Sequence, residues 1–241
     1  MATDLVVALD FNEQATADHM IDQLQGMKLI YKVGLELYLS ADPKWVENLC
    51  VRERVFLDLK LYDIPTTVAA AMVRIAKLGA EFTTVHLSGG RRMLDEIDIR
   101  FQEAMLAGEI SKRPKVLGVS VLTSFKEEDW IANVSHMAKL TGIRSIEDTA
   151  MHFANLVHDH PGVQGMVCSP QEIESIKRKY PDVYLMVPGI RPEGTTSHDQ
   201  NRVMTPKNAS ALGASALVMG RPITQNSNPR AVVEQVLQDI K

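Results

Sequence analysis

The sequence predicts an α/β protein, a (β/α)8 TIM barrel in a single domain. Eight short apolar runs rich in β-branched residues recur along its 241 residues, and amphipathic stretches separate most of them. Alternation of strands with helices indicates a parallel sheet, and eight such repeats in a chain of this length are typical of the barrel. No Gly/Ser/Pro-rich linker and no shift of composition divides the sequence, so we expect one domain over residues 1–241.

The eight predicted strands are nearly continuous apolar runs, as expected for strands that are buried on both faces. Because parallel strands point the same way, their C-terminal ends are expected to meet at one rim. In chain order the strands are Leu5–Leu9, Leu29–Val33, Val55–Leu59, Thr83–Leu87, Val116–Leu122, Gly165–Cys168, Tyr184–Val187 and Ala216–Met219.

The predicted helices lie between these strands and repeat apolar residues at helical spacing. Thr66-Thr67 and Ser169-Pro170 match the residue preferences of helix starts. The long segment from Leu122 to Gly165 is expected to form one loop and two helices. The clearest helical stretches are Ala15–Leu24, Thr67–Leu78, Met93–Ala107, Ile146–His158, Pro170–Lys179 and Arg230–Ile240.

A doubly wound sheet is the alternative architecture. Such sheets usually have fewer strands, and their glycine-rich first turn binds a dinucleotide. The first turn of this chain, Leu9-Asp10-Phe11-Asn12, has no GxGxxG pattern. This difference favours the barrel.

Composition narrows the partners and the compartment. The net charge is -4, so no basic excess is present to neutralise the phosphates of nucleic acid. Cys50 and Cys168 are too few for a disulfide framework and indicate a reducing compartment. The N-terminus lacks a signal-peptide pattern, and no apolar stretch is long enough to span a membrane. We therefore expect a cytoplasmic protein with neither nucleic acid nor a membrane as partner.

The most informative segment is Asp58-Leu59-Lys60-Leu61-Tyr62-Asp63-Ile64-Pro65, which follows the run Val55-Phe56-Leu57. Side chains alternate faces along a strand, so Asp58 and Lys60 share a face. Asp63 lies just beyond, where the strand ends. Because desolvating this much charge is costly, the cluster indicates an active site. A partly exposed salt bridge at a strand end is the alternative.

Polar residues also follow most of the other predicted strands. Active sites of such barrels lie at the C-terminal ends of the strands. Polar residues from at least six strands converge there, which disfavours a purely structural role. They include Asp10, Lys32, Asp58, Lys60, His86, Thr123, Arg191 and Arg221. Of these, His86 is expected only to support the rim by hydrogen bonds.

The last two strand ends predict a phosphate site, because barrels often bind phosphate with the loops after strands seven and eight. Gly189 and Gly220 let backbone N–H groups approach an anion closely. Arg191 and Arg221 carry planar guanidinium groups whose N–H donors are suited to phosphate oxygens. Two solvated surface arginines are the alternative.

A long polar segment, Arg191–Arg202, follows the seventh strand and is rich in turn-forming residues. Loops of this kind often close over a bound ligand. We expect a lid over the anion, with Gln200 or His198 reaching it.

On the other side of the rim, Lys32, Asp58, Lys60 and Asp63 alternate in charge, and such groups can satisfy one another without a metal. A charged Lys60 beside two carboxylates predicts a general acid, not a Schiff-base nucleophile. A metal bound by Asp58 and Asp63 is the alternative, because hard cations take carboxylates. The lysines compete with that metal.

Seven segments together form a specific signature: Val7–Asp10, Lys32–Gly34, Phe56–Pro65, Val85-His86, Leu122–Ser124, Val187–Arg191 and Met219–Ile223. DxKxxDIP is a specific signal, and GIRP and GRPI follow it in the correct order. With this signature the chain resembles the bacterial-type orotidine 5'-phosphate decarboxylase family over essentially its whole length. The family's usual Asn before the threonine of DIPxT is Thr66 here, which is a mild departure.

The resemblance implies decarboxylation of orotidine 5'-phosphate to uridine 5'-phosphate, the last step of de novo UMP biosynthesis, without cofactor or metal. It implies that Lys60 protonates the pyrimidine carbon that loses carbon dioxide, and that Asp58 lies near the scissile carboxylate. Lys32 would bridge the carboxylates and a ribose hydroxyl. Asp63 and Thr67 would reach the neighbouring subunit's site, which implies a homodimer with shared active sites.

The resemblance also assigns the remaining substrate contacts. Asp10 would hold another ribose hydroxyl, Thr123 would lie beside the base, and Pro188 would pack against the base. The phosphate would be bound by Arg191, Gln200, Gly220 and Arg221.

Two other functions stay open on the residues alone. An enzyme similar to 3-hexulose-6-phosphate synthase shares the DxKxxD pattern but uses magnesium. Ile64-Pro65 and the charge of Lys32 favour the decarboxylase over it. A non-catalytic phosphate- or nucleotide-binding barrel is the other alternative, and the presence of every candidate polar residue disfavours it.

Overall fold

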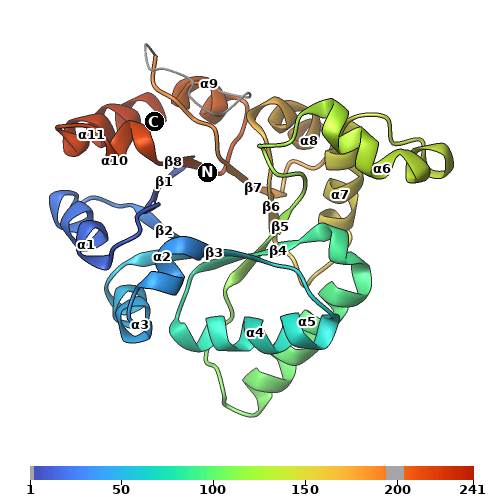
Figure 1. The fold of residues 1–241 in the computed structure, drawn as a ribbon, viewed down its shortest axis with the longest axis horizontal. Helices are drawn as coiled ribbons and strands as arrows, with labels where there is room; N and C mark the ends of the chain where they lie inside the picture. The colour runs from blue at the N-terminus through green and yellow to red at the C-terminus, as the bar shows by residue number, and fades with distance from the viewer. Residues whose placement is uncertain (1–2, 194–203) are drawn as a thin grey trace.

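Eight parallel strands close into one barrel, with the last strand pairing back onto the first (Figure 1). The computed structural model describes residues 3–193 and 204–241, and only the backbone of residues 135–141. The predicted (β/α)8 fold is confirmed. The strands are β1 (Asp4–Ala8), β2 (Ile30–Gly34), β3 (Arg54–Leu61), β4 (Phe82–His86), β5 (Lys115–Val119), β6 (Gly165–Val167), β7 (Tyr184–Val187) and β8 (Ala216–Met219).

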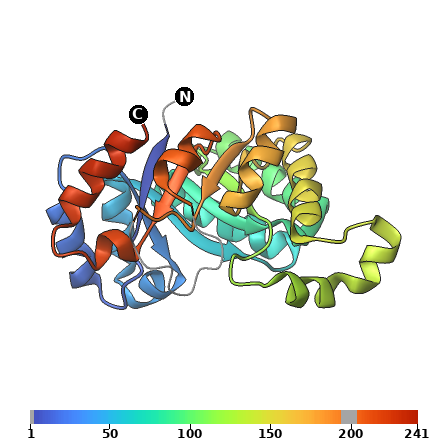
Figure 2. The same ribbon diagram turned by 90° about the horizontal axis from the view of Figure 1, so that it is seen from above.

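Helices surround this barrel (Figure 1). They are α1 (Gln14–Gln23), α2 (Leu35–Ser40), α3 (Pro43–Arg52), α4 (Pro65–Leu78), α5 (Gly90–Leu106), α6 (Glu127–Thr141), α7 (Ile146–His158), α8 (Ile173–Lys179), α9 (Pro206–Ala211), α10 (Arg221–Thr224) and α11 (Pro229–Asp239). Helices α6 and α7 both lie between β5 and β6, as predicted, and Figure 2 shows α6 extending away from the barrel. Among the described residues, no helix has the length and apolarity that crossing a membrane requires.

Four of these helices, α2, α3, α9 and α10, are absent from the prediction. Three of them have only four to six residues, too few to show a repeating apolar spacing. The fourth, α3, carries a start signal in the sequence. Asp42 Oδ1 accepts the Lys44 N–H at 2.7 Å, and Pro43 takes the first helical position.

Strand β5 ends at Val119, before its predicted end at Leu122. Its neighbour β6 has only three residues, and the two strands pair only from Leu117 to Val119. Just beyond, the Ser120 hydroxyl donates to the Val167 carbonyl at 3.2 Å. The end of the apolar run therefore leaves the sheet and becomes part of the rim.

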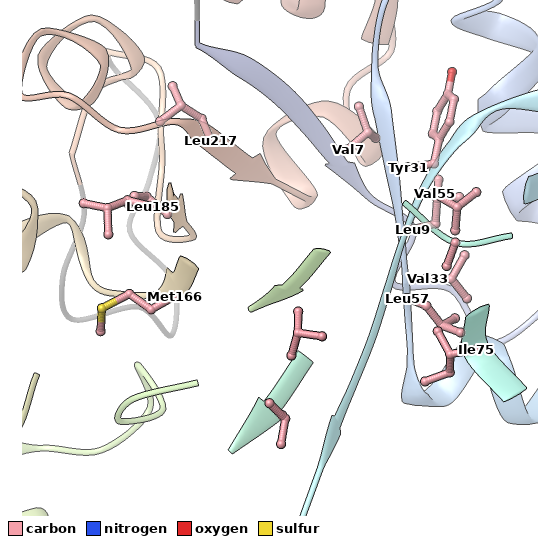
Figure 3. Packing of buried hydrophobic residues seen from close by; sticks show 14 of the residues in the cluster. Val7, Leu9, Tyr31, Val33, Val55, Leu57, Ile75, Met166, Leu185 and Leu217 are labelled. Atoms are coloured by element: carbon pink, nitrogen blue, oxygen red, sulfur yellow. The ribbon is translucent and has the colours of Figure 1, made fainter. Parts of the chain in front are cut away.

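Two apolar layers pack against the strands, one inside the barrel and one between the barrel and the helices. Val6 and Phe56 belong to the inner layer, whereas Val7 and Leu57 belong to the outer one, as the alternation of strand side chains requires. Figure 3 shows part of the outer layer, in which Ile75 of α4 lies beside Leu57. The inner layer closes the barrel interior below the rim.

Charged residues at the N-terminal strand ends form an ion cluster opposite the rim. Arg54 donates to both carboxylate oxygens of Asp4 at 2.8 and 3.1 Å, and to both of Glu81 at 2.8 and 2.9 Å. The Arg54 hydrogen bonds hold the pKa of Glu81 below its ordinary value. Because folding lowers this pKa, the contribution to stability is present above the unfolded pKa and is lost as the pH falls through the folded one.

Thr83 of β4 carries a buried hydroxyl that the fold does not use. Its side chain is fully buried, and its Oγ1 has no hydrogen-bond partner among the described residues. Burying a hydroxyl without a partner is unfavourable relative to a methyl group of the same size. We therefore expect Thr83→Val to raise the free energy of unfolding by about 1 kcal/mol, measured by chemical denaturation. A decrease would contradict this.

Candidate active site

The mouth of the barrel at the C-terminal strand ends is polar, and strand alternation explains why. The residue two positions beyond the last inner-layer residue of each strand also faces inward. On the first four strands that residue is polar, in contrast to the apolar layer below it. The four are Asp10, Lys32, Asp58 and Thr84.

A cavity of about 530 Å³ opens at this mouth. The volume suits a small-molecule ligand. The structure brings nine of the predicted site residues together in its lining. They are Asp10, Lys32, Asp58, Lys60, Thr123, Pro188, Arg191, Gly220 and Arg221.

Four of these side chains form a row of alternating charge. Lys32 Nζ lies 2.7 Å from Asp10 Oδ1 and 4.0 Å from Asp58 Oδ2, and Lys60 Nζ lies 2.6 Å from the same Asp58 oxygen. Lys32 and Asp58 are only 9% and 7% exposed. Each buried charge has an opposite neighbour, which offsets its desolvation. Asp10, and not the predicted Asp63, completes the alternation within this chain.

The backbone of Lys60 is left-handed, with a φ of 48°, and no other non-glycine residue in the described ranges has a positive φ. This conformation costs roughly 1–2 kcal/mol for a residue that has a Cβ. It coincides with a bulge in β3, whose pairing with β4 shifts register between Leu57 and Leu61. Bulges beside active sites re-aim side chains. Here the ammonium of Lys60 points back at Asp58.

Two arginines and two glycines lie elsewhere along the cavity wall. Gly189 has a φ of 83°, which favours glycine, and Gly220 directly precedes Arg221 at the start of α10. Arg191 is buried, and its Nη1 donates to the Ile190 carbonyl at 2.9 Å. Guanidinium groups beside closely approachable backbone are suited to a phosphate dianion.

The predicted lid, Arg191–Arg202, lies largely outside the described residues, and so do Gln200 and His198. The described residues on either side of the gap pair with each other. The Arg191 N–H donates to the Met204 carbonyl at 3.0 Å, and the Met204 N–H donates to the Gly189 carbonyl at 3.2 Å. Gly189–Arg191 and Met204 therefore lie side by side, next to the arginine side of the cavity.

Asp63 and Thr67 do not line the cavity of their own chain. Both are exposed, and Asp63 Oδ1 accepts the Ile64 N–H at 2.6 Å. The neighbouring Tyr62 and Ile64 are 63% and 64% exposed. Large apolar side chains exposed close together are a feature of surfaces that meet another protein. The predicted place of these residues in a partner's site stays a prediction.

His86 lies next to the cavity and is not part of its lining. Its ring packs against Tyr62 with the ring centroids 5.6 Å apart. Burial lowers the pKa of His86, the charge of Lys60 lowers it further, and Asp58 acts in the opposite direction. The neutral ring is therefore favoured near neutral pH. Its expected role in supporting the rim stays a prediction.

Several cavity residues escaped the sequence analysis. Most of the apolar ones continue the inward alternation of their strands, which was an available signal. Thr224 is the last residue of the short helix α10 and Gln225 follows it directly, and without that helix nothing in the sequence indicated their position. Burial raises the pKa of Cys168, which makes its thiol part of the neutral wall. The missed residues include Phe11, Val119, Val121, Val167, Cys168, Met186, Thr224 and Gln225.

The oxygens of Asp58 already have protein donors. Oδ2 accepts from Lys60 Nζ at 2.6 Å, and Oδ1 accepts from the Thr84 hydroxyl at 2.9 Å. In the part of the chain that the structure describes, no group of three or more His, Cys, Asp or Glu side chains is arranged to hold a metal. The carboxylate is thus built into a network of side-chain donors.

The fold and the polar cavity together are those of the (β/α)8-barrel enzymes, a class whose active sites lie at the C-terminal strand ends. A charged row at one part of the cavity and two arginines at another are suited to a small anionic substrate.

Comparison with known proteins identifies the family. The family model described as Orotidine 5'-phosphate decarboxylase / HUMPS family matches residues 3–236. The chain is 40% identical to an orotidine 5'-phosphate decarboxylase of Legionella pneumophila (strain Paris) over 242 residues, covering 100% of each chain. It is 38% identical to one of Listeria monocytogenes serovar 1/2a over 237 residues, covering 97% of each.

A solved structure agrees with these sequence matches. The crystal structure of orotidine 5'-phosphate decarboxylase from Lactobacillus acidophilus has a TM-score of 0.81 at 30% identity and covers 99% of each chain. The chain belongs to the Orotidine 5'-phosphate decarboxylase / HUMPS family. The predicted family and the predicted enzyme class, a carboxy-lyase, are confirmed.

Proposed function

We propose that the protein decarboxylates orotidine 5'-phosphate to uridine 5'-phosphate without a cofactor, in the last step of UMP biosynthesis. The observation that carries this proposal is the charged row Asp10–Lys32–Asp58–Lys60, with spacings of 2.7, 4.0 and 2.6 Å, in a cavity that also contains two arginines. The full-length relatives that bear the decarboxylase name support it.

The arginine side of the cavity binds the phosphate in this proposal. Arg191 and Arg221 supply charge-assisted hydrogen bonds, and Gly220 supplies a backbone N–H. Gln200, which lies outside the described residues, is expected to join them. Binding energy from this non-reacting group can hold the pyrimidine against the charged row, so it contributes to the rate as well as to affinity.

In this proposal the ribose and the base of the substrate lie between the arginine side of the cavity and the charged row. Asp10 and Lys32 are hydrogen-bonded to each other at 2.7 Å and together offer an acceptor and a donor to ribose hydroxyls. Pro188 and Thr123 line the same cavity, and we assign them to contacts with the base.

The chemistry begins with cleavage of the bond between the ring carbon and the carboxylate. Carbon dioxide leaves, and the electron pair stays on a ring carbon that delocalises it poorly. The Lys60 ammonium stabilises this developing charge and then donates a proton to the carbon, becoming a neutral amine. The 2.6 Å contact with Asp58 holds the ammonium in place before the reaction.

Asp58 has a second effect in this mechanism. A substrate carboxylate bound near Asp58 meets a fixed negative charge that is 7% exposed to water. The repulsion disappears as carbon dioxide leaves, so it raises the ground state relative to the transition state. Lys32, 4.0 Å from Asp58, partly offsets that repulsion.

The proposal includes a homodimer with shared sites in the cytoplasm. Asp63 and Thr67 of each chain would complete the cavity of the partner. The support is their exposure beside Tyr62 and Ile64, which leaves this turn available to a second copy.

Mixing the pure protein with orotidine 5'-phosphate and no added metal tests the function. The ultraviolet absorbance should change as uridine 5'-phosphate forms, at the same rate with and without a chelator. Lack of turnover would refute the proposal. Turnover that a chelator abolishes would favour magnesium-dependent chemistry of the 3-hexulose-6-phosphate synthase kind.

Arg221→Ala is expected to raise KM for orotidine 5'-phosphate by about 10- to 100-fold, because it removes charge-assisted hydrogen bonds to the phosphate. Steady-state kinetics measures the change. Arg178→Ala is the matched control, since Arg178 is 74% exposed on α8 and pairs only with Glu174 among the described residues. An unchanged KM for Arg221→Ala would remove Arg221 from the phosphate site.

A further inference from the structure

Thr84 of β4 connects the two residues that perform the chemistry, although it does not line the cavity. Its Oγ1 accepts the backbone N–H of Lys60 at 2.9 Å and donates to Asp58 Oδ1 at 2.9 Å. A hydroxyl has a single hydrogen, and the ionised carboxylate can only accept. The hydroxyl therefore accepts from the backbone of Lys60 and donates to the side chain of Asp58, so both of its hydrogen bonds go to this pair of residues.

The position of Thr84 follows from the bulge in β3. Leu57 pairs with Thr83, and the next pair is Leu61 with Val85. Three residues of β3, including Asp58 and Lys60, thus face the single residue Thr84 of β4. The hydroxyl gives the displaced Lys60 amide a partner at the place where the strand register breaks.

Burial makes this link hard to replace. The Thr84 side chain is 0% exposed, and Asp58 is 7% exposed. A β-branched side chain also has few rotamers, so its oxygen is held in one place. Loss of the hydroxyl would leave the Lys60 amide and one oxygen of the buried Asp58 carboxylate without this partner.

We propose that Thr84 is a positioning residue: its hydroxyl fixes the left-handed backbone of Lys60 and the orientation of Asp58, and so aims the Lys60 ammonium at the reacting carbon. This inference rests on the proposed function. Thr84 itself touches no substrate. It acts on the step in which Lys60 meets the developing carbanion, and it does not act on phosphate binding.

The test compares kcat and KM for Thr84→Val, Thr84→Ser and the wild type. Valine keeps the shape and removes both hydrogen bonds, so kcat should fall by about 10- to 100-fold while KM changes little. Serine keeps the hydroxyl and should restore kcat to within a few-fold. Thr84→Ala removes the same two bonds with less bulk and replaces Thr84→Val if that variant does not fold.

Thr83→Val is the matched control, because Thr83 is the adjacent residue, is equally buried, and has no hydrogen-bond partner in the described part of the chain. Its kcat should equal the wild-type value. A near wild-type kcat for the Thr84 variants that lack the hydroxyl would overturn the proposal. A loss that serine does not restore, or that Thr83→Val shares, would also overturn it.

A second measurement does not depend on turnover. In a crystal structure of Thr84→Val, Lys60 Nζ should have moved from its 2.6 Å contact with Asp58, or the backbone of Lys60 should have left the left-handed region. An unchanged geometry would overturn the positioning role. Failure of the wild type to decarboxylate orotidine 5'-phosphate would instead refute the proposed function, and the two failures are thus distinguished.

Discussion

Lys60→Ala is expected to lower kcat for decarboxylation by about 10⁴-fold or more, because it removes both the proton donor and the positive charge beside the developing carbanion. No other ammonium takes its place, since Lys32 Nζ is held 2.7 Å from Asp10. The fold should persist, because the Lys60 side chain is 38% exposed and its replacement leaves no large buried void. Stopped-assay turnover and thermal unfolding measure the two effects.

Nucleotide binding separates this prediction from a general loss of structure. Lys60→Ala should still bind uridine 5'-phosphate in calorimetry, since the arginine side of the cavity is intact. Lys77→Ala is the matched control: Lys77 lies on α4, pairs with Glu109 at 2.8 Å, and is absent from the cavity lining. Near-normal turnover of Lys60→Ala, in a preparation free of host enzyme, would refute the proton-donor role.

If the proposed homodimer shares its sites, Asp63→Ala is expected to remove most activity, and mixing it with Lys60→Ala should restore part of it. In a hybrid dimer, one barrel keeps its own Lys60 and receives Asp63 from the partner, so one site is intact. Random exchange of equal amounts makes half of the dimers hybrid, and about a quarter of all sites become functional. Turnover measured after demonstrated subunit exchange checks this.

A second mixture is the control for the shared site. Lys60 and Lys32 both line the cavity of their own chain. Mixing Lys60→Ala with Lys32→Ala therefore leaves every hybrid site short of one lysine, and no activity should return. If the Asp63→Ala mixture stays equally inactive, each site is built from one chain only, and Asp63 has another role.

The fold followed from the sequence because each strand is buried on both faces and so appears as an apolar run. The same continuous apolar character made the ends of the strands hard to predict. Val116–Leu122 is one continuous apolar run, yet β5 ends at Val119, because its length is decided by the short neighbour β6. Strand boundaries of this kind depend on pairing between segments that are far apart in the chain. They cannot be predicted from one apolar run alone.

The charged residues of the candidate site were predictable from the sequence. The residue that acts only through hydrogen bonds was harder to predict. Lys32, Asp58 and Lys60 stand out because charged residues at strand ends are costly without partners. Thr84 looks like an ordinary β-branched strand residue, although its inward register two positions beyond Phe82 could have indicated it. The bulge that gives Lys60 its left-handed backbone depends on pairing with β4 and leaves no local sequence signal.

Hydrogen bonds from Arg54 to Asp4 and Glu81 connect the N-terminal ends of β1, β3 and β4. These ends lie opposite the proposed catalytic residues. A cluster that contributes to stability and the proposed catalytic residues therefore lie at opposite ends of the barrel. Substitutions in this cluster, engineered or evolved, are therefore expected to change resistance to heat or acid and to leave the reaction rate unchanged.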